Sequence, residues 1–175
     1  MQSVKTTDRV LRGALVVLLV AFVAVVARAV YERPIHVVVA GEQAPRFRIT
    51  ADNGKAISTP GFAGKLLVLN FWATWCGPCV EETPSLSRFA QDYAGRGVVV
   101  LGISVDASDR AYRAFLAKYK PYFSTVRDSL IHRDFGTFMY PETYIIDSAG
   151  KVALKIEQPA DWSDPKLRAY IDSLL

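Results

Sequence analysis

The sequence is poor in residues that bind metal ions, with 2 cysteines and 2 histidines among 175 residues. A structural zinc site needs four ligands. His36 and His132 are distant in the sequence from each other and from the cysteines, and there is no second cysteine pair. The sequence therefore argues against structural zinc, and we expect neither a metal site nor a cofactor.

The sequence also lacks a strong charge imbalance outside its first thirty residues. Residues 1–30 carry a net charge of +3, whereas residues 31–175 carry 17 basic and 16 acidic side chains. A nucleic-acid-binding surface needs clustered basic residues, often interleaved with aromatic ones, and no such run is present. We therefore discount nucleic acid as a partner.

Charged residues are absent from one long segment near the N-terminus, Gly13–Ala27, which is apolar throughout and follows three basic residues, Lys5, Arg9 and Arg12. Arg12 and Arg28 can extend their charged ends to a membrane surface, which lengthens the segment to nearly the ~20 residues that a bilayer requires. Basic residues on the N-terminal side predict a cytoplasmic N-terminus. Residues 27–29, Ala-Arg-Ala, also have the pattern of a signal-peptide cleavage site, so cleavage stays open.

Whether the apolar segment is kept as an anchor or cleaved as a signal peptide, we expect the rest of the chain to be exported. We predict a cytoplasmic tail and membrane signal-anchor at residues 1–30, a linker at 31–37 and a single domain at 38–175. A protein with two cysteines in an oxidising compartment, and no other disulfides, keeps its thiols for exchange chemistry.

Those two cysteines, Cys76 and Cys79, are separated only by Gly77 and Pro78. They lie between an apolar, strand-like stretch and a helix-like one, which places Cys76 at a helix N-terminus. The helix dipole stabilises a thiolate there and lowers the thiol pKa from about 8.5 toward roughly 7. Cys76 is therefore the expected nucleophile, and Cys79, one turn further along, is suited to resolve a mixed disulfide.

Other uses of the pair are less consistent with the sequence. A structural disulfide across two intervening residues would remove little unfolded-chain entropy, because that stabilisation grows with loop length. Copper(I) bound by two thiolates stays open as an alternative, since soft ligands select soft ions. A thiol-dependent peroxidase is a second alternative, although the Pro-x-x-x-Thr/Ser-x-x-Cys setting of such enzymes is absent before Cys76.

Hydrophobic periodicity and turn residues predict an α/β domain. A turn at 52–55 is expected between two short strands, and a strand, helix and parallel strand unit should follow. Asp164 and Pro165 are expected to begin the last helix. The predicted strands are 65–71, 98–105, 123–126, 143–147 and 152–156, and the predicted helices are 79–93, 109–119 and 164–174, with one or two helical turns at 130–135.

The chain resembles the membrane-anchored thioredoxin-like thiol:disulfide oxidoreductases of the TlpA, ResA and CcmG (DsbE) type. The resemblance extends over roughly residues 38 to 175 and rests on several separated motifs in order. These motifs are Gly41–Phe47, Gly64–Cys76, Glu82-Thr83-Pro84, Pro141–Asp147 and Gly150-Lys151-Val152. The resemblance implies a thioredoxin fold, with a central mixed β-sheet flanked by helices and an added N-terminal β-hairpin, after a transmembrane helix.

The resemblance also implies roles for individual residues. Pro141 matches a cis-proline that exposes the backbone of Tyr140 for strand-like pairing with a substrate and keeps metal from the thiols; the alternative is an ordinary turn proline. The implied substrate-binding residues are Trp75, Gly77, Pro78, Tyr140 and Pro141.

Glu82 matches a glutamate that tunes the cysteine pKa values and relays a proton, so it joins Cys76 and Cys79 as a candidate catalytic residue. Its alternative role is that of a first-turn acid that stabilises the helix. Asn70 stands where thioredoxin has a buried aspartate, and an amide cannot act as a general base. We predict that His132 is a surface residue and that Trp75 lies at the docking face.

The predicted activity is thiol:disulfide exchange through a redox-active Cys76–Cys79 disulfide. The Gly-Pro dipeptide matches that of thioredoxin, near about −270 mV, and favours a reductant over an oxidant of the DsbA kind near about −120 mV. The resemblance implies disulfide-containing exported proteins as substrates, for example in cytochrome c maturation or metal-site assembly. It further implies a membrane thiol reductase as electron donor and a single-pass location in the cytoplasmic membrane, with the domain on the periplasmic side.

Overall fold

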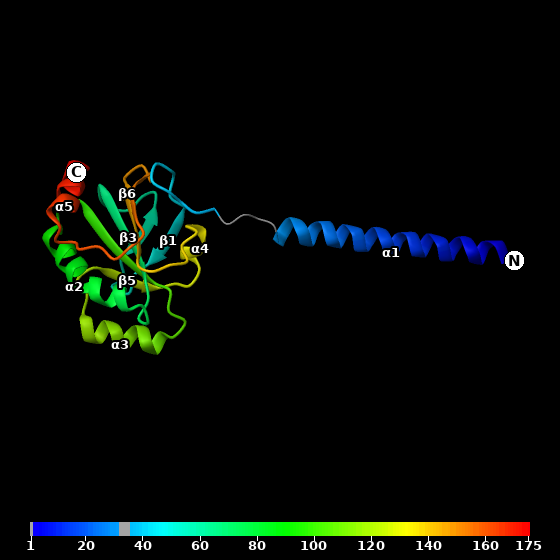
Figure 1. Ribbon diagram of the computed structural model, residues 1–175, viewed down its shortest axis with the longest axis horizontal. Helices are drawn as coiled ribbons and strands as arrows, with labels where there is room; N and C mark the ends of the chain where they lie inside the picture. Colours follow the sequence, from blue (N-terminus) through cyan, green and yellow to red (C-terminus); the bar gives the residue numbers. More distant parts are fainter. Residues whose placement is uncertain (1, 32–35) are drawn as a thin grey trace. The chain divides into compact units, whose positions relative to one another are not determined.

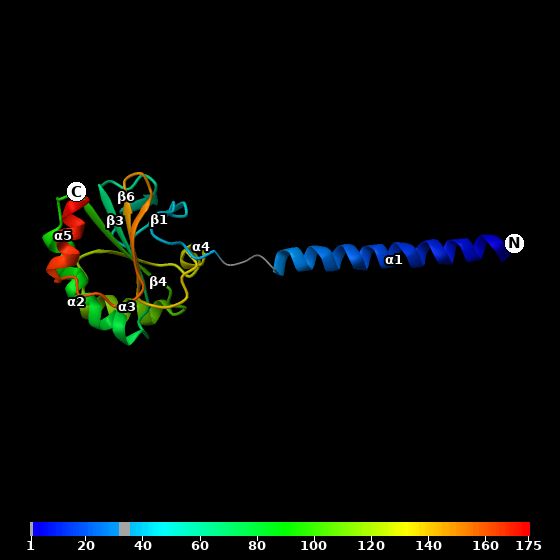
Figure 2. The same cartoon turned by 45° about the horizontal axis from the view of Figure 1, so that its top comes forward.

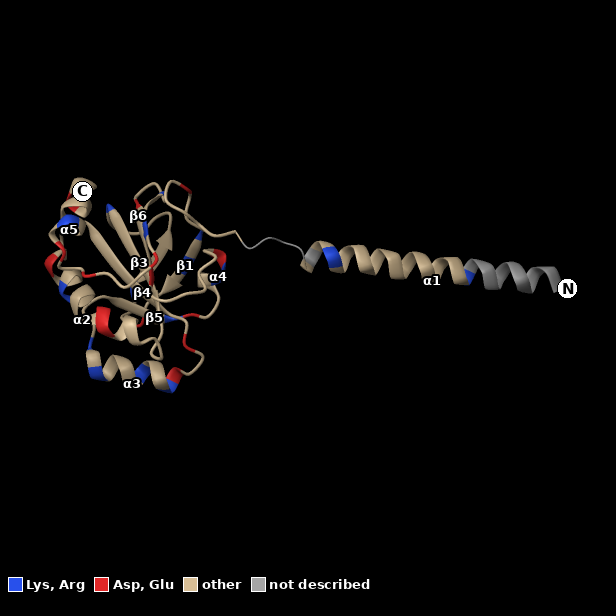
Figure 3. Cartoon of the chain, in the orientation of Figure 1, with Lys and Arg blue, Asp and Glu red and all other residues tan. Residues whose placement is uncertain are grey.

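The computed structural model describes residues 2–31 and 36–175, which belong to two compact units divided between residues 35 and 36. The first unit contains α1 (Gln2–Tyr31). Figure 3 shows no charged residue in α1 between Arg12 and Arg28. The span Arg12–Ala29 has a mean hydropathy of 2.2 and is long and apolar enough to cross a membrane, a property that signal sequences share. The predicted linker, 31–37, falls partly on residues 32–35, outside the described residues.

The second unit is built on a five-stranded mixed sheet in the order β5-β4-β3-β6-β7 (Figure 1). The strands β3, β4 and β5 are parallel, whereas β6 is antiparallel to both β3 and β7. Their bounds are β3 Leu66–Trp72, β4 Val98–Ser104, β5 Ser124–Arg127, β6 Glu142–Asp147 and β7 Val152–Ile156.

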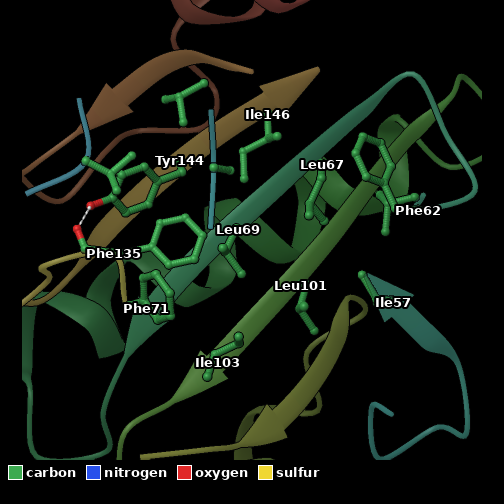
Figure 4. Close-up of a cluster of buried hydrophobic side chains, with 14 of the residues drawn as sticks. Ile57, Phe62, Leu67, Leu69, Phe71, Leu101, Ile103, Phe135, Tyr144 and Ile146 are labelled. Carbon is green, nitrogen blue, oxygen red and sulfur yellow. Dashed lines mark hydrogen bonds between the residues drawn. The ribbon is translucent and has the colours of Figure 1, made fainter. Parts of the chain in front are cut away.

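The central strand, β3, is buried along its whole length, because it is apolar on both faces. Leu66 and Val68 face one hydrophobic cluster, which also contains residues of α2 (Gly77–Asp92) and α5 (Pro165–Ser173). The alternate residues face a second cluster, drawn in Figure 4, in which aromatic rings of the loop before β6 and of β6 itself pack on the sheet. The sheet is therefore covered on both faces.

An antiparallel hairpin of β1 (Phe47–Thr50) and β2 (Ala56–Thr59) contributes to the second cluster, and the short α4 (Ile131–Asp134) lies nearby (Figures 1 and 2). The remaining helix, α3 (Asp109–Tyr119), buries Tyr112 and Phe115 in a third cluster that includes both cysteines. The thioredoxin fold with an added N-terminal hairpin is thus confirmed.

Local boundaries differ slightly from those predicted. The helix after the cysteines begins at Gly77 rather than at residue 79, because Pro78 fits the first turn, where no N–H is required. The strand predicted at 123–126 begins at Ser124, and the turns predicted at 130–135 form the single short helix α4. On α3, Tyr112 is buried, and its hydroxyl donates to Asp52 at 2.7 Å.

The segment that enters the second unit packs against the loop between α4 and β6. The backbone N–H of Val38 donates to the carbonyl oxygen of Phe135 at 3.0 Å, and Val38 is buried. Gly136 has φ +67°, and a Cβ placed on it would lie 2.7 Å from the Cα of Val37. Only glycine allows the backbone of residues 36 and 37 to come this close to position 136, so residues 36–38 pack tightly on the loop before β6.

Candidate active site

Cys76 and Cys79 form a disulfide at the N-terminus of α2. Cys76 is the N-cap residue, and its Sγ accepts the backbone N–H of Cys79 at 3.2 Å. The sulfurs are nearly buried, since Cys76 is 6% exposed and Cys79 3%. A negative charge that forms on Cys76 therefore meets the backbone N–H of Cys79 and the positive end of the helix dipole.

The loop before β6 lies directly over this pair. The Tyr140–Pro141 peptide bond is cis, which confirms the conformation that the resemblance implies for Pro141. The carbonyl oxygen of Tyr140 lies 3.3 Å from the Sγ of Cys76. In the dithiol state that carbonyl is placed to accept a hydrogen bond from the Cys76 thiol.

Exposed apolar side chains border the sulfurs. Trp75 is 68% exposed, and its ring meets that of Tyr140 edge-on, with centroids 5.8 Å apart. Phe138 and Met139, just before Tyr140, are also exposed. We call these four residues the apolar rim. A partner whose sulfur bonds to Cys76 comes close to Tyr140, whose carbonyl oxygen lies 3.3 Å from that sulfur.

Asp106 anchors the loop that carries Trp75, a role that sequence reasoning missed. The carboxylate of Asp106 accepts the backbone N–H of Thr74 at 2.9 Å and its hydroxyl at 2.7 Å. Ser104 donates to the same carboxylate at 2.6 Å. A signal for this role is present in the sequence, because Asp106 follows a buried parallel strand and therefore lies at the edge of the sheet where such strands end.

His132 holds the other side of the site. Its Nδ1 lies 2.8 Å from the carbonyl oxygen of Thr137 and 3.1 Å from the hydroxyl of Tyr140, and its Nε2 lies 3.2 Å from the carbonyl oxygen of Ser129. The sequence predicts a surface residue, and the structure leaves His132 partly exposed, in contact with the loop that carries the cis-proline. Its loop contacts could not be inferred from its neighbours in the sequence.

Glu142, directly after Pro141, forms hydrogen bonds that hold the same loop against β6. Its Oε1 accepts hydrogen bonds from the hydroxyls of Thr137 and Tyr144, and its Oε2 lies 3.4 Å from the Nζ of Lys155. Both charged side chains are 7% exposed. Lys155 also pairs with Glu157 at 2.8 Å. The hydrogen bonds of Glu142 to Thr137 and Tyr144 therefore give it a structural role in holding the loop.

Glu82 lies on α2, three residues after Cys79, and is 5% exposed. The indole N–H of Trp162 donates to its Oε1 at 2.6 Å, whereas Oε2 is buried and forms no hydrogen bond with the described residues. Burial raises the pKa of Glu82 from 4.5 to about 7, against the opposing effects of Trp162 and the backbone of Ala160. Glu82 is therefore not a solvated first-turn acid, unlike its exposed neighbour Glu81.

Asn70 is buried on β3, and its Nδ2 donates to the hydroxyl of Thr143 at 2.8 Å. An amide with this partner neither accepts nor releases a proton. On α2, Glu82 is the buried carboxyl group nearest in sequence to the cysteines. It is therefore the candidate for proton transfer.

These groups are arranged for thiol–disulfide exchange. A thiolate at Cys76 has a stabilising helix end, Cys79 is bonded to it and so lies within reach, and the apolar rim gives a partner a surface to cover.

The comparisons with known proteins agree with this chemistry. The AhpC/TSA family profile matches residues 40–155. The thiol-disulfide oxidoreductase ResA of Bacillus thuringiensis subsp. konkukian is 32% identical over 136 residues, which cover 77% of this chain and 78% of the relative. The thiol:disulfide interchange protein HelX of Rhodobacter capsulatus is 33% identical over 142 residues, covering 78% of this chain and 77% of the relative.

Solved structures agree as well. A Chlorobium tepidum protein described as a thiol:disulfide interchange protein DsbE superposes with a TM-score of 0.70 at 26% identity, and the match covers 79% of this chain and 99% of that one. Family profile, relatives and fold all point the same way: the chain belongs to the AhpC/TSA family of thioredoxin-like proteins and is a thiol-disulfide oxidoreductase.

Proposed function

We propose that this oxidoreductase is an exported, membrane-tethered reductant of disulfides in other exported proteins. The thiolate of Cys76 attacks a partner disulfide, forms a mixed disulfide and releases one partner sulfur as a thiolate. Cys79 then attacks the Sγ of Cys76, the bond between Cys76 and the partner breaks, and its electron pair leaves on the second partner sulfur. The partner gains two electrons, and the enzyme is left with the Cys76–Cys79 disulfide.

The observation that carries the exchange step of this proposal is the position of Cys76 as the N-cap of α2, with its Sγ 3.3 Å from the carbonyl oxygen of Tyr140. The Gly-Pro dipeptide between the cysteines favours the reducing direction. The proposed substrate-binding residues are Trp75, Gly77, Pro78, Tyr140 and Pro141. An extended substrate segment would pair with the backbone at Tyr140, and its apolar side chains would lie on the apolar rim.

Glu82 is the proposed proton acceptor. When Cys79 attacks, its thiol must lose a proton, and a buried carboxylate on the same helix with a pKa near neutrality is suited to take it. The proton then passes to solvent through the hollow that Glu82 lines together with Pro78, Glu81 and Asp161.

The proposed compartment follows from the basic N-terminus and apolar α1, which favour a cytoplasmic tail and an exported domain. A reductant outside the cytoplasm needs electrons from a membrane thiol reductase. By resemblance, its substrates include apocytochrome c and proteins of copper-site assembly.

The reduction potential of the Cys76–Cys79 pair tests the direction of transfer. The full chain in detergent micelles is equilibrated with glutathione buffers, and the thiols are trapped by alkylation. We expect a value below roughly −220 mV, whereas a value near −120 mV would mark an oxidant and overturn the proposal.

Rapid consumption of peroxide that depends on Cys76 would favour the peroxidase alternative. Tight Cu(I) binding with little disulfide reductase activity would favour a metallochaperone.

A trapping experiment tests the assigned roles of the two cysteines. Cys79→Ser should accumulate a mixed disulfide through Cys76 that is visible on a non-reducing gel, because the resolving thiol is absent. Cys76→Ser should form none, and disulfide reduction should fall to the uncatalysed rate in both variants. If Cys76→Ser traps the partner instead, the assigned roles are reversed.

A further inference from the structure

Trp162 is completely buried, although its indole carries a polar N–H group. It precedes α5 and lies 80 residues after Glu82, to which its indole, the only donor of the side chain, donates at 2.6 Å. The other carboxylate oxygen, Oε2, is also buried, and no residue in the described part of the chain forms a hydrogen bond with it. One oxygen of Glu82 is thus fixed, and the other remains available.

Several contacts fix Trp162 itself. Its ring packs on Phe89 of α2, with centroids 5.0 Å apart. Arg168 of α5 donates through Nε to the carbonyl oxygen of Trp162 at 2.8 Å and pairs through Nη2 with Asp92 of α2 at 2.7 Å. Phe89 thus contacts the indole and Arg168 holds the backbone of Trp162, so the N–H cannot turn away from Glu82 without moving the segment before α5.

We propose that Trp162 is a positioning residue for the redox reaction, which holds Glu82 through Oε1 so that Oε2 is free to take the proton of Cys79. This inference rests on the proposed role of Glu82. In the resolving step, the Cys79 sulfur bonds to the Cys76 sulfur, the bond between Cys76 and the partner breaks, the electron pair leaves on the partner sulfur, and the Cys79 proton passes to Oε2.

The electrostatic surroundings give the direction of the effect. Burial favours the neutral form of Glu82, while the hydrogen bond from Trp162 and the backbone of Ala160 favour the ionised form. The charged residues Glu81 on α2 and Asp161 before α5 line the same hollow as Glu82. Arg168 on α5 bonds to the backbone of Trp162. Loss of the indole N–H should therefore raise the pKa of Glu82 and leave its charged neighbours unchanged.

Trp162→Phe tests the inference, because it keeps a buried aromatic ring and removes the donor. The full chain in detergent micelles is reduced and mixed with 5,5′-dithiobis(2-nitrobenzoate) in a stopped-flow instrument. Attack by Cys76 releases one thionitrobenzoate, and attack by Cys79 releases the second. We expect the midpoint pH of the second phase to rise by about 1 unit in Trp162→Phe, with a loss of rate of about fivefold at pH 7.

Tyr93→Phe is the matched control. Tyr93 stacks on Phe89, with centroids 4.3 Å apart, and its hydroxyl donates to Asp172 at 2.8 Å. The control therefore removes one donor to a carboxylate from the same aromatic stack without touching Glu82. Its pH midpoint should equal that of the wild type, and a shift equal to that of Trp162→Phe would show a purely structural effect and overturn the inference.

Glu82→Gln separates the two proposals. If Glu82→Gln changes the pH profile and Trp162→Phe does not, the inference about Trp162 is wrong and the role of Glu82 stands. If Glu82→Gln leaves the profile unchanged, the proposed role of Glu82 fails.

A measurement on the wild type needs no variant: the indole N–H resonance of Trp162 should titrate with the midpoint of the second phase. A resonance that does not change with pH would refute the contact.

Discussion

At the scale of single residues, Glu82 combines a buried carboxyl group with an incomplete set of hydrogen bonds. Its pKa of about 7 in the folded protein lies above the ordinary 4.5. Between these values the folded state binds more protons than the unfolded state, so the free energy of unfolding falls as the pH rises. The contribution of protonated Glu82 to the free energy of unfolding is complete below about pH 4.5 and is lost above about pH 7.

We therefore predict that Glu82→Gln makes the oxidised protein more stable relative to the wild type as the pH rises through this window. The gain should approach about 3 kcal/mol above pH 7, because one pKa unit corresponds to about 1.4 kcal/mol. Urea unfolding of the full chain in detergent micelles at several pH values measures it. Glu81→Gln, at the exposed neighbouring position, should show no such trend, and parallel profiles for Glu82→Gln and wild type would contradict the prediction.

The cysteines, Pro141 and Glu82 could be found from the sequence because each belongs to a short motif. The partners that organise them could not. Trp162 is 80 residues from Glu82, and Asp106 is 32 residues from Thr74, so only folding brings these pairs together. The residues around Trp162 in the sequence give no local pattern that separates core packing from a hydrogen bond to a distant buried carboxyl group.

At the scale of secondary-structure elements, local patterns predicted the fold well. The two hairpins and the parallel unit around α2 follow from turn residues and apolar runs. The packing of residues 36–38 on the loop before β6 could not be predicted in this way. The sequence around Gly136 does not show that the backbone of residues 36 and 37 lies next to this glycine.

We predict that Gly136→Ala is far more damaging than Gly54→Ala. Both glycines have positive φ, +67° and +80°, so both substitutions cost roughly 1–2 kcal/mol in backbone conformation. The new methyl group at Gly136 would also meet the backbone of residues 36 and 37, whereas that at Gly54 meets nothing within 4 Å. The free energy of unfolding should therefore fall by more than about 3 kcal/mol at Gly136.

Equilibrium unfolding of the two variants in the same buffer compares these costs. Reductase activity should also fall more in Gly136→Ala, since the displaced loop continues into Tyr140 and Pro141. Equal losses of stability would show that the contact with residues 36–38 contributes nothing.

At the scale of the whole molecule, the sequence separates an apolar helix from a redox domain of nearly balanced charge. If α1 is an uncleaved anchor, a chain tagged at its N-terminus should stay in the membrane pellet after an alkaline wash and keep its tag. After reduction, Cys76 should react with a membrane-impermeant maleimide in intact cells. Loss of the tag with release of the domain would indicate cleavage, and labelling only after permeabilisation would place the domain in the cytoplasm.

The capping of α2 by Cys76 makes the charge at that helix end depend on how many electrons the protein holds. The cap is a neutral sulfur in the disulfide and an anion once the reduced pair ionises. Any interaction that strengthens the anionic cap stabilises the reduced protein and so makes it a weaker electron donor, by about 30 mV for each 1.4 kcal/mol. A substitution in the first turn of α2 that stabilises the helix by strengthening the anionic cap therefore raises the reduction potential and makes the protein a weaker electron donor.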